Sequence, residues 1–351
     1  MKIDVVIPWV TSDDPKWQSL RQKHAPKTQK EEQGGLKSKS GDSDEELFRD
    51  WDTLRYLLRG IHAHMPWVNR IFLVTMNQHP TWLQLPKETS DAAGRHTLQL
   101  VDHTSFIPKE YLPTFSSHTI ELNFHRLPSL SEHFIYFNDD MLPVRPLKPT
   151  DFFDPSGLPK DQASLFRISQ PEYDSIYGHI LLNNVALLNQ HFSTTDLKKH
   201  KKIYSTKQGL AKVLASLPYL RYQNLPGFMN PHGPQPFQKS TFENLWQLEP
   251  KVLNQTCQNK FRTIHDVNQY LFRDYQLVTG RYSPANISRR TRFFKDFPRQ
   301  FPALEQALQD PSIKLICIND DITDDFQKSN AKMHQILETH FPNPSPWEHK
   351  K

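Results

Sequence analysis

The sequence predicts an α/β protein with a Rossmann-like, mostly parallel sheet and an α-rich insertion before the last strand. Three observations predict this fold. Short apolar runs alternate with amphipathic helical segments through the first half of the 351 residues, and continuous apolar runs are typical of strands covered on both faces. After residue 170 the pattern changes to helical segments separated by proline. One strand-like run, residues 313–319, then returns to the earlier chemistry.

The strands are expected where β-branched and aromatic residues gather in short runs. Most of these runs are apolar throughout, so we expect helices on both faces of the sheet. The expected strands are residues 3–10, 70–76, 97–102, 133–138, 164–169 and 313–319.

The most regular helical pattern lies between the first two expected strands. Its apolar side chains recur every three or four residues and therefore share one face of a helix. They are Trp51, Leu54, Leu57, Leu58, Ile61 and Met65. The preceding residues, 22–45, are almost free of apolar side chains and cannot contribute to a core. We expect them to form a mobile loop, either a lid over a ligand or an inert insertion.

The pattern divides the chain into four parts with no linker-like stretch between them. Residues 1–170 are expected to form the α/β core, and residues 171–310 the α-rich part. Residues 311–330 bring the last strand back to the core. Residues 331–351 are expected to be a short helix followed by a frayed tail.

The composition excludes several classes of protein. With 36 % hydrophobic residues and 22 Phe the chain is globular and not disordered. It contains no run of about 18 to 20 apolar residues that would span a membrane, and its N-terminus lacks the layout of a signal peptide. We therefore expect it in the cytoplasm. Its two cysteines, Cys257 and Cys317, have no metal or redox spacing and are expected to be buried thiols.

The net charge of +5 suits a nucleic acid, an anionic membrane surface or a phosphorylated substrate. The basic clusters at 197–202 and 288–292 are short and lack a nucleic-acid-binding motif. We therefore expect no nucleic-acid partner, and interpret these clusters as solvated faces or as peripheral contacts with a membrane.

The sequence Asn-Asp-Asp ends two expected strands, at residues 138–140 and 319–321. Open α/β folds place ligands at the carboxyl edge of the sheet, where Asp139 and Asp140 would lie. Adjacent carboxylates repel each other unless a cation, an arginine or a shared proton intervenes, and Mg²⁺ bridging to phosphate is the most economical partner. An ordinary turn explains such a pair equally well. We expect both strand ends to meet at one site of one sheet.

Three further residues lie in expected loops. Asp14 follows the first strand, where hydroxyls and N–H groups suit a phosphate or a ribose; a proline-containing turn is the plainer interpretation. His232 lies between prolines and is available as a general base or phosphate ligand, although most single loop histidines have no such role. Arg262 suits a phosphate or a surface ion pair.

These residues and their surroundings resemble the Stealth family of sugar-1-phosphate transferases. The likeness covers nearly the whole chain in the family's order. Residues 3–17 resemble the first conserved region of the family, residues 48–83 and 112–141 the second, residues 231–263 the third and residues 316–322 the fourth. Thr11 and Ser12 replace an Asp-Gly pair that is common in the first region, so only Asp14 carries over there with Trp9.

The resemblance implies a role for each candidate residue. It makes Asp139 and Asp140 the ligands of Mg²⁺ or Mn²⁺, with Glu121 beside them. It implies that His232 and Arg262 act on the phosphates of the donor, and that Asp320 faces the same site. The resemblance places four further matched residues at the nucleotide: Trp9, Asp14, Arg55 and Arg59. For the two arginines, a role in the fold is the alternative.

The implied reaction is the transfer of a sugar-1-phosphate from a UDP-hexose or UDP-N-acetylhexosamine to a hydroxyl of a glycan acceptor, with release of UMP. The resemblance implies capsule or exopolysaccharide synthesis, with a lipid-linked acceptor at the inner face of the membrane as one expected setting. Catalysis would depend on positioning and on neutralising phosphate charge. His232 is the first choice as general base, and Asp320 or Glu121 would orient it or replace it.

Two other functions fit the sequence. A metal-dependent glycosyltransferase would use the same carboxylates to hold a UDP-sugar but would release UDP. A basic scaffold or nucleic-acid-binding protein would have no such activity, and the missing recognition motif disfavours it.

Overall fold

The computed structural model describes residues 1–25, 51–84, 97–169, 171, 173, 175–319 and 325–349. Most of the loop expected at 22–45 lies outside these ranges, as do Asp320 and Asp321.

The centre of the molecule is a five-stranded sheet with the strand order β3-β2-β1-β4-β7. Four strands are parallel, and only β7, at one edge, runs antiparallel to its neighbour. This sheet confirms the Rossmann-like, mostly parallel fold. Its strands are β1 (Ile3–Pro8), β2 (Arg70–Thr75), β3 (Thr97–Asp102), β4 (His133–Tyr136) and β7 (Gln235–Gln238).

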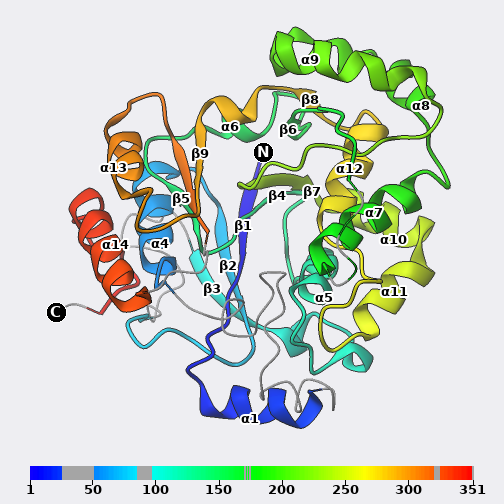
Figure 1. The fold of residues 1–351 in the computed structure, drawn as a ribbon. Helices are drawn as coiled ribbons and strands as arrows, with labels where there is room; N and C mark the ends of the chain where they lie inside the picture. Colours follow the sequence, from blue (N-terminus) through cyan, green and yellow to red (C-terminus); the bar gives the residue numbers. More distant parts are fainter. Residues whose placement is uncertain are drawn as a thin grey trace.

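Helices cover both faces of this sheet, as Figure 1 shows. The alternation of side chains along β1 explains the two layers, because Val5 and Ile7 enter one buried cluster and Val6 enters the other. The first cluster includes α4 (Leu54–His64), α13 (Phe301–Gln309) and α14 (Phe326–His340). The second includes α5 (Ser117–Leu122), α7 (Ile176–Leu188), α10 (Lys239–Leu248), α11 (Pro250–Gln258) and α12 (Tyr270–Val278).

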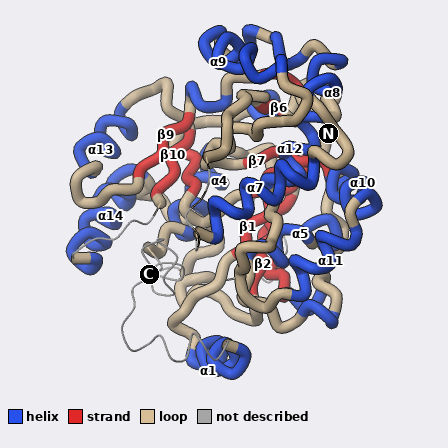
Figure 2. Tube along the Cα trace, turned by 45° about the vertical axis from the view of Figure 1, so that its right-hand side comes forward, coloured by secondary structure: helices blue, strands red, loops and turns tan. Residues whose placement is uncertain are grey.

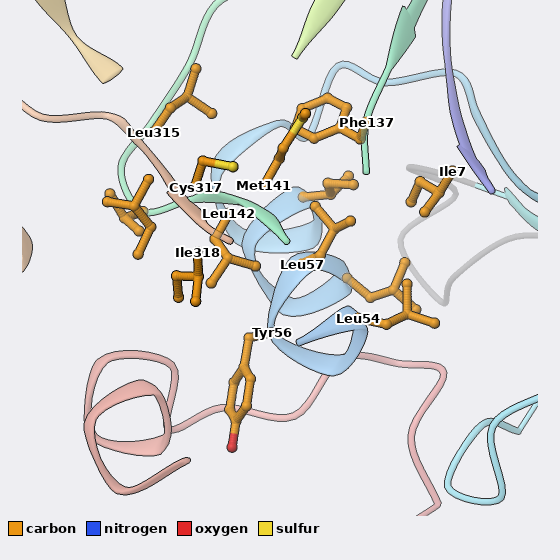
Figure 3. Close-up of a cluster of buried hydrophobic side chains, with 14 of the residues drawn as sticks. Ile7, Leu54, Tyr56, Leu57, Phe137, Met141, Leu142, Leu315, Cys317 and Ile318 are labelled. Carbon is orange, nitrogen blue, oxygen red and sulfur yellow. The ribbon is translucent and has the colours of Figure 1, made fainter. Parts of the chain in front are cut away.

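The amphipathic helix predicted between the first two strands is α4, and every apolar residue assigned to its inner face and flanks is buried. Figure 3 shows Leu57 of this helix on the side that faces Phe137 and Met141. The helix therefore packs beneath the segment that leaves β4.

The last strand belongs to a second sheet, so the prediction that both Asn-Asp-Asp ends lie in one sheet is wrong. This sheet has the order β5-β10-β9 and consists of β5 (Met141–Pro143), β10 (Leu315–Ile318) and β9 (Thr291–Phe294). Figure 2 shows β9 and β10 side by side, apart from β1 and β2. The chain turns after β4 and starts β5, and it is β5 that β10 pairs with.

The strand predicted at 164–169 is also wrong. These residues run beside residues 226–229 but form only one ladder bridge, between Leu165 and Phe228. Pro226 has no N–H to donate, which prevents a regular ladder. Conversely β7 and β9 were not predicted. β7 contains Pro236, and proline in a strand is tolerated at a sheet edge, where β7 lies.

The prediction of a frayed C-terminal tail is wrong for residues 341–349, because these residues pack on the core. The side chain of Trp347 is fully buried. Glu348 pairs with Arg59 of α4 at 2.6 Å, and residue 348 forms a bridge with Leu83. Residues 341–349 therefore contact α4 and stabilise the packing of α14 against it.

The remaining elements surround the core. None of the helices among the described residues combines the length and the apolar character needed to cross a bilayer. The elements around the core are α1 (Pro15–His24), α6 (Pro149–Phe152), α8 (Thr194–Lys199), α9 (Leu210–Ser216), β6 (Lys160–Asp161) and β8 (Ser283–Pro284).

Candidate active site

The candidate site lies at the point of the sheet where the strand order reverses, beside β1. β2 lies on one side of β1 and β4 on the other, and in open α/β sheets a ligand crevice forms outside the carboxyl ends of two such strands. Asp14 follows the end of β1, while Asp139 and Asp140 occupy the turn between β4 and β5. The sequence therefore places carboxylates on both sides of the crevice.

Asp140 is the point where three distant segments meet. Its Oδ2 lies 3.1 Å from Nε2 of His232 and accepts a hydrogen bond from the Cys317 thiol at 3.2 Å. Its Oδ1 is buried and has no hydrogen-bond partner among the described residues. The predicted association of Asp140 with His232 is thus present in the geometry.

His232 reaches Asp140 because of the direction of β7. The antiparallel pairing sets Gln235, the first residue of β7, opposite Tyr136, the last residue of β4. The loop before β7 therefore lies at the carboxyl end of β4. The ring of Phe293 in β9 packs edge-on against the His232 ring, with the centroids 5.1 Å apart.

The second Asn-Asp-Asp run approaches the first through β10. The backbone N–H of Ile318 donates to the Asp140 carbonyl at 2.9 Å, and Cys317 is the thiol that donates to the Asp140 carboxylate. Thus β10 adjoins the site although it belongs to the other sheet. Asp320, expected to face this site, lies outside the described residues.

Glu121 of α5 occupies the buried floor of the region. It accepts a hydrogen bond from the Tyr136 hydroxyl at 2.9 Å, and the same hydroxyl contacts Asn138 beside the Asp pair. Burial raises the pKa of Glu121 to about 7, although the Tyr136 hydrogen bond and the charge of Arg262 act in the opposite direction. A carboxyl group with such a pKa can exchange a proton near neutral pH.

Arg262 approaches from the segment between α11 and α12. Its Nη2 donates to the Ser117 hydroxyl at 2.8 Å, and Ser117 begins the helix that carries Glu121. Nearby, His118 and Asp266 form a buried pair at 3.1 Å, which anchors this segment to α5. Arg262 is half-buried and adds positive charge close to Glu121.

The loop after β1 is held by a residue that was not predicted, Gln78. Its buried amide bonds both the N–H and the carbonyl of Thr11 at 3.0 Å and reaches Asp14 at 3.3 Å. Asp14 also caps α1 by accepting from Lys16 N–H, which lowers its pKa. Trp9 is 6 % exposed and belongs to the core cluster, so most of its ring is covered by protein.

The two arginines of α4 lie with the C-terminal segment. Arg59 is 5 % exposed, and it pairs with Glu348 at 2.6 Å and with Glu338 at 2.9 Å. Arg55 pairs with Asp52 at 3.4 Å and stacks over Trp82. The contacts of Arg59 favour a role in the fold over the expected role at the nucleotide.

The residues around the Asp pair suit a hard cation. The unpartnered Oδ1 of Asp140 is the type of ligand atom that Mg²⁺ prefers. Asp140, His232 and Cys317 also bring three ligand atoms within 4.8 Å of one another. Burial raises the pKa of the Cys317 thiol, however, and a protonated thiol is a poor metal ligand. The donor set therefore fits an oxygen-bound cation better than a thiolate-bound one.

Cys317 is a site contact that the sequence interpretation missed, having treated it as a plain buried thiol. It is buried and free of disulfides, as predicted. Its position two residues before Asn319 was the available signal, because residues two apart on a strand share a face.

Two conserved regions of a known family match the chain. Residues 47–161 match the family model for Stealth protein CR2, conserved region 2, and residues 306–351 match that for Stealth protein CR4, conserved region 4. The first region spans Glu121, Asp139 and Asp140.

Curated relatives match almost end to end. The capsular polysaccharide phosphotransferase WcwK of Streptococcus pneumoniae is 35 % identical over 343 residues, covering 96 % of this chain and 97 % of the relative. The receptor polysaccharide phosphotransferase WefC of Streptococcus oralis is 37 % identical, covering 91 % and 90 %. The exopolysaccharide phosphotransferase cps2G of Lactiplantibacillus plantarum is 33 % identical, covering 99 % and 96 %.

Among solved structures, the galactosyltransferase LgtC with donor and acceptor sugar analogues is similar at 10 % sequence identity. The similarity covers 98 % of each chain, with a TM-score of 0.41.

Proposed function

The chain belongs to the Stealth family, and we propose that it is a phosphotransferase of capsular or exopolysaccharide synthesis that transfers a sugar-1-phosphate from a UDP-sugar to a hydroxyl of an acceptor glycan. The relatives named for phosphotransfer in such polysaccharides support the reaction class. The observation that carries the proposal is the contact of Asp140 with His232 at the switch point of the sheet.

In the proposed step, the acceptor oxygen attacks the phosphorus atom that bears the sugar. A bond forms between these two atoms, and the bond from that phosphorus to the bridging oxygen of UMP breaks. UMP leaves with the bond's electron pair, and the hydroxyl proton passes to the general base. The bond between the sugar and its own phosphate is retained, so the product is a phosphodiester.

His232 is our candidate for the general base. A carboxylate only accepts hydrogen bonds, so a neutral His232 ring donates a hydrogen bond from its Nε2–H to Asp140. The ring then carries an unprotonated Nδ1 that can accept the proton of the acceptor hydroxyl. Asp140 is in this respect a positioning residue, because it fixes the tautomer and the orientation of the ring.

The phosphate charge would be balanced from two sides. Arg262 lies on the side of α5, where its guanidinium suits a non-bridging phosphate oxygen. Asp139 and Asp140 would hold a divalent cation, which would supply further charge neutralisation to the phosphates. Glu121, with a pKa of about 7, and Asp320 are the residues that would support or replace His232.

We further propose a lipid-linked acceptor, met at an anionic membrane surface. The support comes from α9 and the turn after it, where Leu210, Leu214 and Leu217 are 59 %, 55 % and 39 % exposed. Exposed basic residues lie before and after these leucines in the sequence: Lys199, which pairs with Asp196, Lys201, Lys207 and Arg221. Apolar side chains flanked by lysine and arginine are typical of surfaces that lie in a membrane interface.

A donor panel tests the proposed reaction. UDP-hexoses and UDP-N-acetylhexosamines are incubated with the enzyme and Mg²⁺, with and without a glycan acceptor, and the nucleotide products are separated. The proposal expects UMP, released faster when acceptor is present. Stoichiometric UDP would instead indicate ordinary glycosyl transfer and would contradict the proposal.

A further inference from the structure

A cavity of about 270 Å³ lies against His232. It is lined by the loop before β7, the starts of β9 and β10, and residues of β6, α9 and α12. His232 and Phe293 belong to its lining, whereas Glu121 and Arg262 do not. The cavity thus adjoins the candidate base without including the groups assigned to the donor phosphates.

The volume suits a single sugar unit. Sites for drug-sized ligands occupy roughly 300 to 1,000 Å³, and a whole nucleotide sugar belongs in that range. This cavity is smaller. Much of its wall is apolar, with Phe152, Phe293 and Pro231 among its members, and such surfaces suit the C–H face of a pyranose ring.

Gln235 supplies the chemical argument. This residue lines the cavity and is 4 % exposed, yet neither its amide nitrogen nor its amide oxygen has a hydrogen-bond partner among the described residues. A buried amide without partners is costly, and a turn of the Gln235 side chain into the cavity would bring its amide, which is buried in this conformation, to a ligand. The Gln235 amide needs one group that accepts a hydrogen bond from its nitrogen and one that donates a hydrogen bond to its oxygen. Sugar hydroxyls do both, whereas phosphate oxygens at neutral pH chiefly accept.

Two of the four lysine and arginine side chains that line the cavity are already paired with carboxylates, which reduces the attraction for an anionic ligand; the other two are Lys160 and Lys212. Arg273 pairs with Asp161 at 2.8 Å, and Arg290 pairs with Asp151 at 2.7 Å. The ammonium of Lys212 contacts oxygen atoms of three neutral residues, Gln162, Asn286 and Ser288.

We propose that this cavity binds the acceptor as a neutral, hydroxyl-rich sugar unit, with Gln235 bonding its hydroxyls and His232 beside the hydroxyl that reacts. The proposal rests on the proposed phosphotransfer, and it names the substrate class and the residues of the acceptor side.

The first test is Gln235→Leu, assayed with methyl glycosides of hexoses and N-acetylhexosamines as acceptors. We expect the KM for the best glycoside to rise about tenfold or more, as for the loss of a buried hydrogen bond. The melting temperature should be unchanged or higher, because the variant removes an unpartnered amide. The KM for the UDP-sugar is measured in parallel, which separates an effect on the acceptor from an effect on the donor.

A second variant, Gly233→Val, tests the cavity by filling it. A Cβ at this position meets nothing closer than Thr291 Cγ2 at 3.6 Å, so the backbone should tolerate it. The same rise in acceptor KM is expected, together with loss of the saturation-transfer NMR signal between the protein and the glycoside.

The outcomes separate this proposal from the one on which it rests. An unchanged acceptor KM in both variants would overturn the acceptor cavity, and so would a change confined to the donor KM. The phosphotransfer proposal is tested separately by the nucleotide product of the wild-type enzyme, and it fails if that product is UDP in place of UMP.

Discussion

Asp140 makes two contacts through one carboxyl oxygen and none through the other among the described residues. Its Oδ2 contacts both His232 and Cys317, and its Oδ1 is unpartnered among the described residues. The first oxygen can therefore orient the imidazole while the second remains available to a cation. This division explains how one residue can belong to the metal site and to the acid-base machinery.

At the residue scale, the first prediction concerns His232. His232→Gln should lower kcat by about 10²- to 10⁴-fold, the usual contribution of a positioned base, with little change in the KM for the UDP-sugar. His191→Gln is a matched control, because His191 is 31 % exposed and pairs with Glu249, while His232 is 32 % exposed and pairs with Asp140. Turnover near the wild-type rate in His232→Gln would exclude this base.

The second prediction concerns the buried carboxyl group of Glu121. Burial raises its pKa from 4.5 to about 7, so the folded state holds a proton that the unfolded chain releases above pH 4.5. Stability should therefore fall between pH 4.5 and 7 by roughly 3 kcal/mol, at about 1.4 kcal/mol per pH unit.

Glu121→Gln removes this titration, so the variant should gain stability relative to the wild type as the pH rises from 5 to 8. Denaturant unfolding at several pH values measures the difference. A difference between wild type and variant that does not change with pH would contradict the raised pKa.

The sequence was sufficient to select several residues of the site but not their contacts. The strand-end position singled out Asp139 and Asp140, the proline-flanked loop singled out His232, and the resemblance added Glu121. Cys317 and Gln78 were missed because each acts on a residue far along the chain: Cys317 donates to Asp140, 177 residues away. Such pairings depend on the folded arrangement and leave no local pattern.

At the scale of elements, β7 has the largest effect on the site. Its antiparallel pairing with β4 brings His232 to the Asp pair. The parallel strands were predicted because they are apolar runs, and β7 was not, because prolines interrupt it. The sequence thus identified the strands that build the core more readily than the strand that completes the site.

The contact between α4 and the C-terminal segment gives the third prediction. Arg59→Met leaves Glu348 buried without its partner, and breaking a buried ion pair in this way costs about 3 to 5 kcal/mol. We expect a lower melting temperature and an unchanged KM for the UDP-sugar.

Arg55→Met is the control, because Arg55 is 26 % exposed and its partner Asp52 is 36 % exposed, where ion pairs contribute at most about 1 kcal/mol. If Arg59→Met kept its stability but lost affinity for the donor, the expected role at the nucleotide would replace the structural one.

At the scale of the whole molecule, the basic residues are distributed unevenly. In the cluster 288–292, Arg290 is held by Asp151, while Arg289 and Arg292 are exposed. In the cluster 197–202, Lys202 bonds the carbonyls of Gly280 and Tyr282, while Lys199 and Lys201 are exposed. Both clusters thus keep exposed cations, but three exposed leucines, Leu210, Leu214 and Leu217, lie near the second in the sequence, so the surface around α9 is the better candidate for contact with a membrane.

The fourth prediction follows from this surface. Wild-type protein should float with vesicles of phosphatidylglycerol and phosphatidylethanolamine, and the triple variant Leu210→Ser, Leu214→Ser, Leu217→Ser should bind at least about tenfold more weakly, given about 25 cal/mol for each Å² of apolar surface buried. Leu248→Ser is the control, because Leu248 is 38 % exposed on α10. Equal binding of all three proteins would refute the assignment.

The central claim is that the acceptor attacks phosphorus and not the anomeric carbon. It is tested most directly with a UDP-sugar that carries ¹⁸O in the bond between the anomeric carbon and its phosphate. Mass spectrometry then follows the label after transfer to the acceptor. If the acceptor attacks phosphorus, the label stays in the glycan phosphodiester and UMP is unlabelled. Label found in released UDP, with a product lacking phosphate, would contradict it.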